Sequence, residues 1–428
     1  MGGENASRRD GVGHSAGHVG GSGPWRVGWR TPVVIVLCGC LISMISFGPR
    51  ATLGFFLTPM SQMNGWGRDV FGLALAIQNI LWGIGQPFAG AIADRFGTTR
   101  VLCTGGALYA IGLILMAYST SPGMLDVTAG VLVGFGLSGC SFSVVLAAFG
   151  KLLPERLRLF AFGAGTAAGS FGQFLYSPLA VSLMDAFGWQ TALLVFGMGM
   201  LLVLPLSLAL ATAPAETGVG QGAASQSLRQ ALAEAMGHRS YVLLVLGFFT
   251  CGFQLAFITV HMPAYLIDRG LSAQVGGWTI AVIGLFNIVG SLASGWLGTL
   301  MPKRYLLSFI YFARAAAVFG FIIFPVTPFS SILFGAVMGL LWLSTVPPTN
   351  GIIALIFGTR WLATLAGLAF FSHQVGGFLG VWLGGVAFVR TGSYDVVWWL
   401  SILFGVLSAV INLPIVEKPV VRAAAAPA

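Results

Sequence analysis

Charged residues are scarce in this sequence. Asp, Glu, Lys and Arg together make up 8% of its 428 residues, whereas 57% of the residues are hydrophobic. Because a soluble domain carries roughly 25% charged residues, this composition excludes a soluble protein. The charges that remain are unbalanced, with 21 basic and 12 acidic residues. We therefore expect the chain to lie in a lipid bilayer.

Cysteine is also scarce, and motifs for chemistry are missing. The five cysteines all fall within apolar stretches, and Cys38 and Cys40 would point to different sides of a helix. The sequence thus predicts neither a disulfide framework nor a metal site. The motif GHSAG at residues 13–17 lacks the strand–turn–helix context of a serine hydrolase. We expect neither enzymatic activity nor a cofactor.

Long apolar runs are abundant instead. A helix needs about 20 apolar residues to cross the hydrocarbon core, and the runs are continuously apolar, which favours helices over membrane strands. The predicted fold class is an all-α membrane protein with twelve transmembrane helices. The predicted spans are 33–58, 69–93, 101–119, 127–150, 159–183, 190–212, 240–266, 276–298, 305–325, 330–356, 362–388 and 396–416.

One long loop divides the spans into two sets of six. It begins with a Pro/Gly/Ser/Gln-rich linker and continues as SLRQALAEAM, residues 227–236, in which Ser227 can cap a short helix with one apolar face. We expect this amphipathic helix to lie on the cytoplasmic surface. The predicted parts are a disordered segment 1–30, a six-helix bundle 31–212, the linker 213–239, a second six-helix bundle 240–416 and a tail 417–428.

The basic residues indicate the orientation, because Lys and Arg are retained on the cytoplasmic side. With the N-terminus inside, 16 of the 21 basic residues fall on that side. We therefore predict a multi-pass protein of the cell inner (plasma) membrane with both termini cytoplasmic. The pI of 9.7 reflects this topology, so we expect no nucleic-acid partner, and we expect a monomer.

The loop between the second and third spans carries a specific motif, GAIADRFGTTR at residues 90–100. It resembles the signature of the major facilitator superfamily: Gly, three residues, Asp-Arg, one residue, Gly, then basic residues. A degenerate copy, GWLGTLMPKR at 295–304, occupies the equivalent second-half loop, as two pseudo-symmetric bundles require. The alternative is an ordinary basic loop that only fixes orientation. The residues that the resemblance assigns to a conformational latch are Gly90, Asp94, Arg95, Gly97 and Arg100.

A narrower resemblance covers nearly the whole chain after residue 30. Residues 136–175 and 344–380, with the first span, are similar to the bacterial monocarboxylate-porter and oxalate:formate-exchanger branch. This branch implies transport of small organic anions by rocking of two halves. Proton-coupled porters commonly carry an Asp and an Arg on the eighth helix, where this chain has Asn287 and Ser291. Exchange or facilitated movement therefore stays open, with a histidine or the substrate's own carboxylate as routes for protons.

No acidic residue is predicted inside the membrane. All twelve map to loops, tails or span ends, whereas Arg50, Arg314, His261 and His373 lie within spans. A charge at bilayer depth costs about 2.5 kcal/mol or more unless it faces protein, water or a counter-ion. Because the protein supplies no acidic partner there, an anionic substrate is the expected counter-ion.

Arg50 is the main candidate for binding this anion. It follows Gly48 and Pro49, which loosen the helix, and a guanidinium can hold a carboxylate by two hydrogen bonds. The alternative is an arginine that extends to the outer headgroups. For Arg314 that alternative, or helix packing, is the favoured interpretation. His261 is either a substrate ligand or an interfacial residue. His373 shares a glycine stripe that favours packing, but Ser372, His373 and Gln374 offer three hydrogen-bonding side chains together, so His373 is also a substrate-binding candidate.

Further polar residues would complete a cavity. A Pro347-Pro348 break in span ten favours a position beside the pathway, because broken helices at membrane depth need protein or water around them. The alternative function is a multidrug or other small-molecule efflux transporter of the same superfamily, which usually has an acidic residue within the membrane. The additional substrate-binding candidates are Gln173, Tyr176, Gln254, Asn287 and Asn350.

Overall fold

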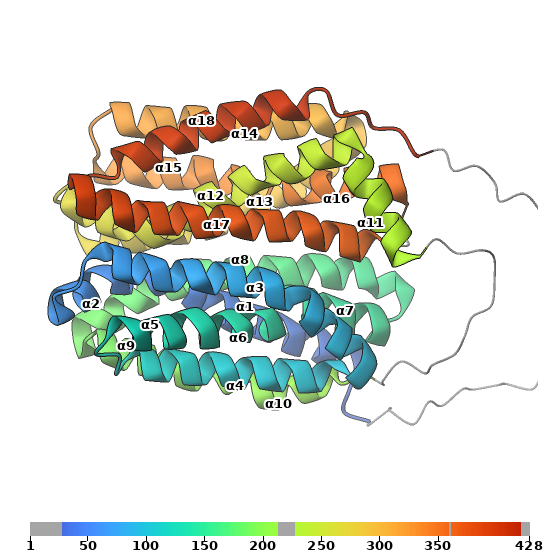
Figure 1. The fold of residues 1–428 in the computed structure, drawn as a ribbon. Helices are drawn as coiled ribbons and strands as arrows, with labels where there is room; N and C mark the ends of the chain where they lie inside the picture. The colour runs from blue at the N-terminus through green and yellow to red at the C-terminus, as the bar shows by residue number, and fades with distance from the viewer. Residues whose placement is uncertain (1–27, 213–226, 359–360, 421–428) are drawn as a thin grey trace, which may run out of the picture.

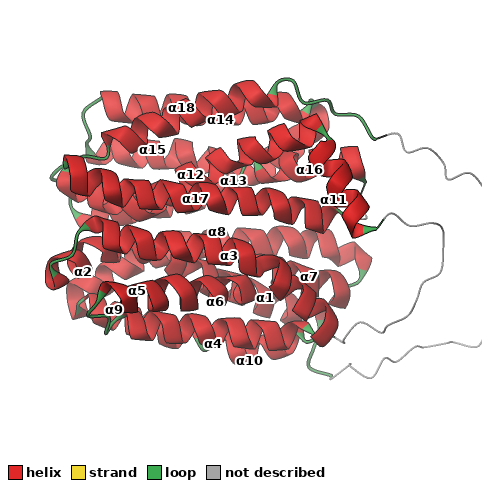
Figure 2. Ribbon diagram, viewed as in Figure 1, coloured by secondary structure: helices red, strands yellow, loops and turns green. Residues whose placement is uncertain are grey.

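The structure is a computed structural model that describes residues 28–212, 227–358 and 361–420. These residues form helices and connecting loops, with no strand among them (Figure 2). Ten stretches are long and apolar enough to cross a membrane. Two further long helices, α3 (Arg68–Phe96) and α8 (Glu155–Phe187), lie in the same bundle (Figure 1). The described chain therefore confirms the predicted set of twelve spans.

The first six spans make up the N-terminal half. Several of them are divided into consecutive helical segments, so that one span can carry more than one label. Their bounds, besides α3 and α8, are α1 Pro32–Thr52, η1 Leu53–Phe56, α2 Leu57–Asn64, α4 Thr98–Met116, α5 Pro122–Leu125, η2 Asp126–Leu132, α6 Val133–Cys140, α7 Phe142–Leu152, α9 Trp189–Met200, α10 Val203–Ser207 and η3 Leu208–Leu210.

The last six spans make up the C-terminal half, which is preceded by the short helix α11. Only the tenth span is divided, into α15 and α16, in this half. The bounds are α11 Leu228–Gly237, α12 Arg239–Asp268, α13 Ala273–Leu300, α14 Lys303–Ile323, α15 Pro328–Leu341, α16 Val346–Phe357, α17 Leu362–Thr391 and α18 Asp395–Asn412.

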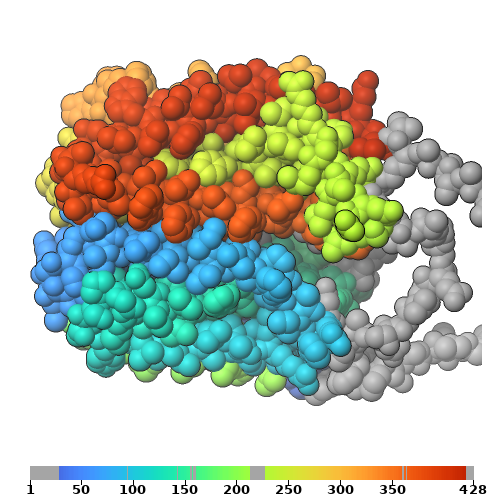
Figure 3. Space-filling model, in the orientation of Figure 1, coloured from blue at the N-terminus to red at the C-terminus, as the bar shows by residue number. Residues whose placement is uncertain are grey.

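The two halves lie one above the other in Figure 1 and meet along a seam. Helix α3 runs beside α17, and α8 packs on α13. The space-filling view shows the seam between α3 and α17 as a line where blue meets orange (Figure 3). We call the end of the bundle that holds Pro32, Leu210 and Leu228 the linker face, and the end that holds Asn64 and Asp268 the opposite face.

Local sequence determines the helix ends. Thr31 Oγ1 accepts a hydrogen bond from the Val34 amide at 3.3 Å, and Pro32 occupies the first helical position of α1. Gly97 ends α3 with φ of 91°, a left-handed value that favours glycine. A Cβ at Gly97 would also lie 2.8 Å from the carbonyl oxygen of Thr212. Position 97 of the motif therefore requires glycine for two reasons, its left-handed φ and the close approach of the Thr212 carbonyl.

The short helix predicted after the linker is present as α11 and lies over the linker face (Figure 3). Ser227 and Gln230 form a capping box at its start. Ala231 and Ala235 are buried, but Leu228 and Met236, which we predicted on the same apolar face, are 43% and 54% exposed. Helix α11 therefore packs on the bundle through a narrow i, i+4 stripe rather than through its whole apolar face.

Two spans are interrupted at corresponding places in the two halves. Span four changes from α6 to α7 at Ser141, and span ten changes from α15 to α16 across residues 342–345. The predicted break in span ten is thus confirmed, but it precedes Pro347 and Pro348. These prolines occupy the first turn of α16, where a missing amide hydrogen costs little.

Candidate functional site

Arg50, in the last turn of α1, lies inside the bundle against α3. Its Nη2 donates to Asn79 Oδ1 at 2.8 Å, and its guanidinium carbon lies 4.9 Å from the centroid of the Trp82 ring. Nε is buried without a hydrogen-bond partner, and no acidic side chain of the described chain pairs with Arg50. An amide and an aromatic face thus hold the cation while donors are left for another molecule.

Aromatic side chains from both halves surround this arginine. Trp82 packs edge to face on Phe370 of α17, with ring centroids 5.4 Å apart. On the α1 side, the ring of Tyr176 packs directly on Gly48, two residues before Arg50. The rings of Trp82 and Phe47, whose centroids lie 4.9 and 6.0 Å from the guanidinium carbon, thus give the guanidinium apolar neighbours, beside which an unpaired charge is costly.

A hydrogen-bonded chain connects this arginine with His373 across the seam. His373 Nδ1 lies 2.9 Å from Gln374 Oε1, and Gln374 Nε2 donates to the backbone carbonyl of Asn79 at 3.0 Å. Asn79 also accepts from Arg50 through its side chain. Arg50 therefore bonds to Asn79 directly, and His373 is connected to Asn79 through Gln374. These contacts place Arg50, Asn79, Gln374 and His373 in one polar group, which we call the central cluster.

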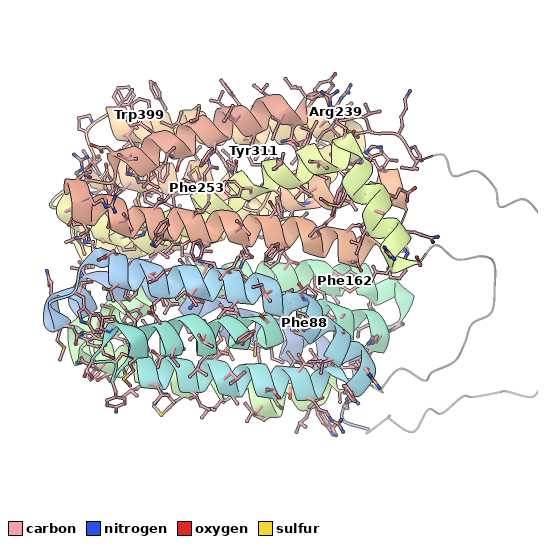
Figure 4. All side chains as sticks on the ribbon, in the orientation of Figure 1. Phe88, Phe162, Arg239, Phe253, Tyr311 and Trp399 are labelled. Carbon is pink, nitrogen blue, oxygen red and sulfur yellow. The ribbon has the colours of Figure 1, made fainter. Side chains whose placement is uncertain are left out.

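The other buried arginine, Arg314, has a different environment. It is 0% exposed, and its Nε donates to the Leu341 carbonyl at 3.0 Å while Nη2 bonds to the carbonyls of Leu341 and Trp342. These carbonyls belong to the end of α15, where the break in span ten removes their helical partners. Nη1 has no partner in the described chain. Arg314 lies beside Tyr311, which Figure 4 labels inside the C-terminal half, and its bonds stabilise the break.

Asn287 supplies a hydrogen-bond partner for the backbone at the break in span ten. Its Oδ1 accepts from the Leu343 amide at 2.9 Å, and its Nδ2 donates to Ser170 Oγ on α8 at 2.9 Å. One side chain thus joins the broken span of the C-terminal half to the N-terminal half. Gln173, one turn further along α8, donates to the Ile280 carbonyl at 3.1 Å across the same seam.

The remaining candidates from the sequence lie elsewhere. Gln254 donates to the Ser401 carbonyl at 2.8 Å, within the C-terminal half. His261 is 0% exposed, and its ring nitrogens lie 2.8 Å from the Val381 carbonyl and 3.3 Å from Tyr394 Oη. Asn350 is half-buried on α16 and makes no side-chain hydrogen bond within the described residues.

A second polar group joins the halves at the opposite face. Arg68, at the start of α3, forms a bidentate ion pair with Asp268 at 2.5 and 2.6 Å and donates to Tyr394 Oη at 2.9 Å. Its guanidinium also lies 3.8 Å from the Phe388 ring centroid. Gln274 donates to Asp185 at 2.8 Å on the same face. These contacts close the seam there.

The seam has a pocket at each end. At the opposite face a pocket of about 360 Å³ is lined by Ser61, Trp66 and Arg68 of the N-terminal half and by Phe388 and Val389 of α17. At the linker face the pocket is smaller. A pocket of about 270 Å³ lies between α3 and α17, with Leu232 of α11 over it. Its walls are apolar and include Ile84, Pro87, Leu368 and Phe371. Among the described residues, the polar contacts named above between the halves lie at the opposite face and in the middle of the bundle, whereas the linker-face pocket is apolar.

The motif residues lie at the linker end of α3 and the start of α4. Arg95 and Arg100 are exposed, and the side chain of Asp94 is outside the described part of the chain. A Cβ at Gly90 would meet no atom within 4 Å among the described residues, so the close helix approach expected there is not present in this structure. The conformation of Gly97 accounts for that glycine, as shown above.

The sequence analysis missed several functional candidates. It did not name Asn79 or Trp82 of the site, and it did not predict the contact between Arg68 and Asp268. Asn79 follows Gln78 within the otherwise apolar run AIQNILW, and paired amides in a predicted span are the signal that could have found it. Arg68 and Asp268 are 200 positions apart in the sequence. A local sequence pattern therefore cannot predict their contact.

Known proteins show similarity over most of the chain. Residues 39–381 match the family model described as Major Facilitator Superfamily. The uncharacterized MFS-type transporter YcxA of Bacillus subtilis is 31% identical, over 88% of this chain and 93% of its own. Monocarboxylate transporter 13 of Rattus norvegicus is 26% identical, over 87% of this chain and 84% of its own.

Solved structures share the fold. The D-xylose-proton symporter aligns with a TM-score of 0.67 at 16% identity, over 91% of this chain and 98% of that one. A bacterial homologue of the human lysosomal transporter Spinster, in an inward-facing and occupied conformation, aligns with a TM-score of 0.70 at 15% identity, over 92% and 97%. At these low sequence identities, the structural similarity supports the fold assignment alone.

Proposed function

We propose, because this chain belongs to the Major Facilitator Superfamily and to its monocarboxylate-porter-like branch, that it transports a small organic anion across a membrane by alternating access. The expected substrate is a monocarboxylate or a small dicarboxylate. One observation carries this choice: Arg50 lies inside the bundle with open donors and without an acidic partner in the described chain.

Electrostatics favours an anion at this position. A guanidinium away from water loses its hydration, and an amide oxygen and a ring face replace only part of it. A carboxylate would form charge-assisted hydrogen bonds, which are about twice as strong as neutral ones. Tyr176, whose ring packs on Gly48 two residues before Arg50, is the proposed additional contact.

Acidic side chains offer no alternative counter-ion. The structure describes seven of them, and they lie at helix ends or outside the spans: Asp69, Asp126, Asp185, Glu234, Asp268, Asp395 and Glu417. A transporter selecting cations would need such a group beside its pathway. The described residues therefore favour an anionic cargo over a cationic one.

We assign the linker face to the cytoplasm. Arg95, Arg100, Lys303 and Arg304 lie at this end of the helices, as cytoplasmic loops require. Because Arg68 and Asp268 join the two halves at the other face, we propose that this conformation is inward-facing. Rocking of the bundles 31–212 and 240–416 would break that pair and close the linker-face pocket. A monomer in the plasma membrane is sufficient for this cycle.

The test is ligand binding and exchange by the purified protein. Formate, pyruvate, L-lactate and oxalate are assayed with nitrate as an inorganic anion and choline as a cation. We expect at least one carboxylate to raise the melting temperature and to exchange across proteoliposomes loaded with the same anion. Stabilisation and transport by choline alone would reject the anionic substrate, and nitrate alone would reject the organic one.

A further inference from the structure

We propose that His373 is the group that binds a proton for co-transport with the anion, an inference that rests on the function proposed above. His373 is half-buried on α17. Its ring stacks on Phe370 with centroids 5.6 Å apart and contacts Phe248 at 5.1 Å. These two rings fix the plane of the imidazole, and its position in the central cluster connects it to Arg50.

The hydrogen bonds assign the nitrogen that takes the proton. The backbone carbonyl of Asn79 can only accept, so the amide nitrogen of Gln374 must face it. Gln374 Oε1 then faces His373 Nδ1 at 2.9 Å, which requires a hydrogen on Nδ1. Nδ1 therefore donates in both charge states of the ring, and the added proton binds at Nε2.

The groups around His373 allow both charge states. From α12, the Cys251 thiol lies near the imidazole, and a thiol can serve as a weak donor or a weak acceptor. From α14, Arg314 and Tyr311 face the same thiol, and from α1 Arg50 lies at the far end of the cluster. No carboxylate of the described residues pairs with the ring.

This arrangement couples the proton to the anion. An imidazolium and a guanidinium joined through Gln374 and Asn79 repel each other, and an anion between them offsets that repulsion. The anion therefore favours protonation, and protonation favours anion binding by the same factor. A proton from water adds to Nε2 on one side and returns to water on the other, so a monocarboxylate and its proton cross without net charge.

His261 does not fulfil this role. Both of its ring nitrogens have partners, it is 0% exposed, and its contacts belong to the group at the opposite face. No recorded hydrogen bond joins His261 to Arg50. The two membrane-depth histidines thus differ in their burial and in their hydrogen bonds. Only His373 is half-buried and is also linked to Arg50 through Gln374 and Asn79.

The test separates proton movement from anion movement. Proteoliposomes with an entrapped pH dye receive inward gradients of formate, pyruvate, L-lactate and oxalate in turn, with protein-free vesicles as background. We expect the parent protein to acidify the lumen with its transported anion. His373→Asn keeps a donor near the Nδ1 position but cannot titrate, so acidification should fall at least tenfold while anion exchange stays within threefold. His373→Gln is a second non-titrating variant, and His238→Asn, outside the cluster, is the matched control.

The outcomes are distinguishable. Parental acidification by a folded His373→Asn or His373→Gln protein overturns the assignment, and so does a parent that exchanges anions without acidification. An equal loss of exchange and acidification in both variants makes His373 an anion contact instead, which also rejects the proton role. If the parent exchanges none of the four anions, the proposed function fails, and the inference fails with it.

Discussion

The two halves each bury an arginine, and the arginines differ in what they contact. Arg314 uses Nε and Nη2 on two backbone carbonyls at the break in span ten. Arg50 makes one hydrogen bond, to an amide oxygen, and leaves Nε without a partner. A buried arginine thus indicates a binding site only when backbone carbonyls do not already accept hydrogen bonds from its guanidinium.

The same contrast applies to the two interrupted spans. When the halves are aligned on Gly90 and Gly295, Tyr109 of α4 stands where Arg314 stands in α14. The break in span four is supported by neutral groups, with Gln86 Nε2 donating to Ser141 Oγ at 2.8 Å. The N-terminal half therefore holds its break without a cation, and its arginine is available to a ligand.

Removal of Arg314 should give the largest change in stability. Arg314→Met leaves the carbonyls of Leu341 and Trp342 unpaired, and each buried unpaired group costs about 1–3 kcal/mol. We expect a loss of about 4 kcal/mol, measured by thermal or denaturant unfolding in detergent. Arg229→Met, at an exposed arginine on α11, is the control and should stay near the parent. A stable Arg314→Met protein would show that the break needs no support.

Removal of Arg50 should affect transport rather than stability. Arg50→Ala is expected to lower carboxylate uptake at least 100-fold, about 2.7 kcal/mol, and to change unfolding by less than about 1 kcal/mol, because a buried charge is removed with its bond. Arg50→Lys keeps the charge without the planar fork and should retain about a tenth of the uptake. Parental uptake by folded Arg50→Ala would remove Arg50 from the site.

The two breaks can be compared by removing their amides. Asn287→Leu leaves the buried Leu343 amide unpaired and removes the bond to Ser170, so we expect a loss of about 2 kcal/mol. Gln86→Leu should cost about 1 kcal/mol, since Gln86 is half-buried and Ser141 also bonds within its own span. Unfolding of both variants side by side measures the difference. Equal losses would contradict the proposed asymmetry.

Weakening the opposite-face contact should have the smallest effect. Asp268→Asn replaces a partly exposed ion pair with a neutral hydrogen bond, worth about 1 kcal/mol. We expect a roughly fivefold faster reaction of a cysteine introduced at Ser61, in a background without the native cysteines, with an impermeant maleimide. Asp185→Asn is the comparison, because Asp185 bonds to an uncharged glutamine. An unchanged rate in Asp268→Asn would mean that the pair does not hold the seam closed.

The sequence predicts the spans well because lipid leaves few options. Twelve apolar runs become the described spans, and the capped helix after the linker is present, since both follow from local composition. The break in span ten could be predicted to exist but not placed, because proline is tolerated in a first turn. Leu228 and Met236 are exposed because the width of a helix contact depends on the partner.

The site was predictable only at Arg50. Its charge at membrane depth is visible in the sequence, but its partners Asn79 and Trp82 depend on which face of α3 turns toward α1. The carbonyls that accept hydrogen bonds from Arg314 also depend on packing. For Arg314 the favoured interpretation was helix packing or extension to the headgroups. The sequence shows which polar residues are present. Tertiary contacts between distant segments decide which of them form hydrogen bonds with one another.

The seam also determines the order in which this protein can be built. Helix α3 enters the bilayer early in synthesis, whereas Gln374, which bonds to the Asn79 carbonyl, lies 295 residues later. Until α17 is inserted, the seam side of α3 faces lipid or whatever insertase holds the nascent chain. A chain truncated before span eleven would therefore leave this polar face uncovered, and quality-control proteases could recognise it.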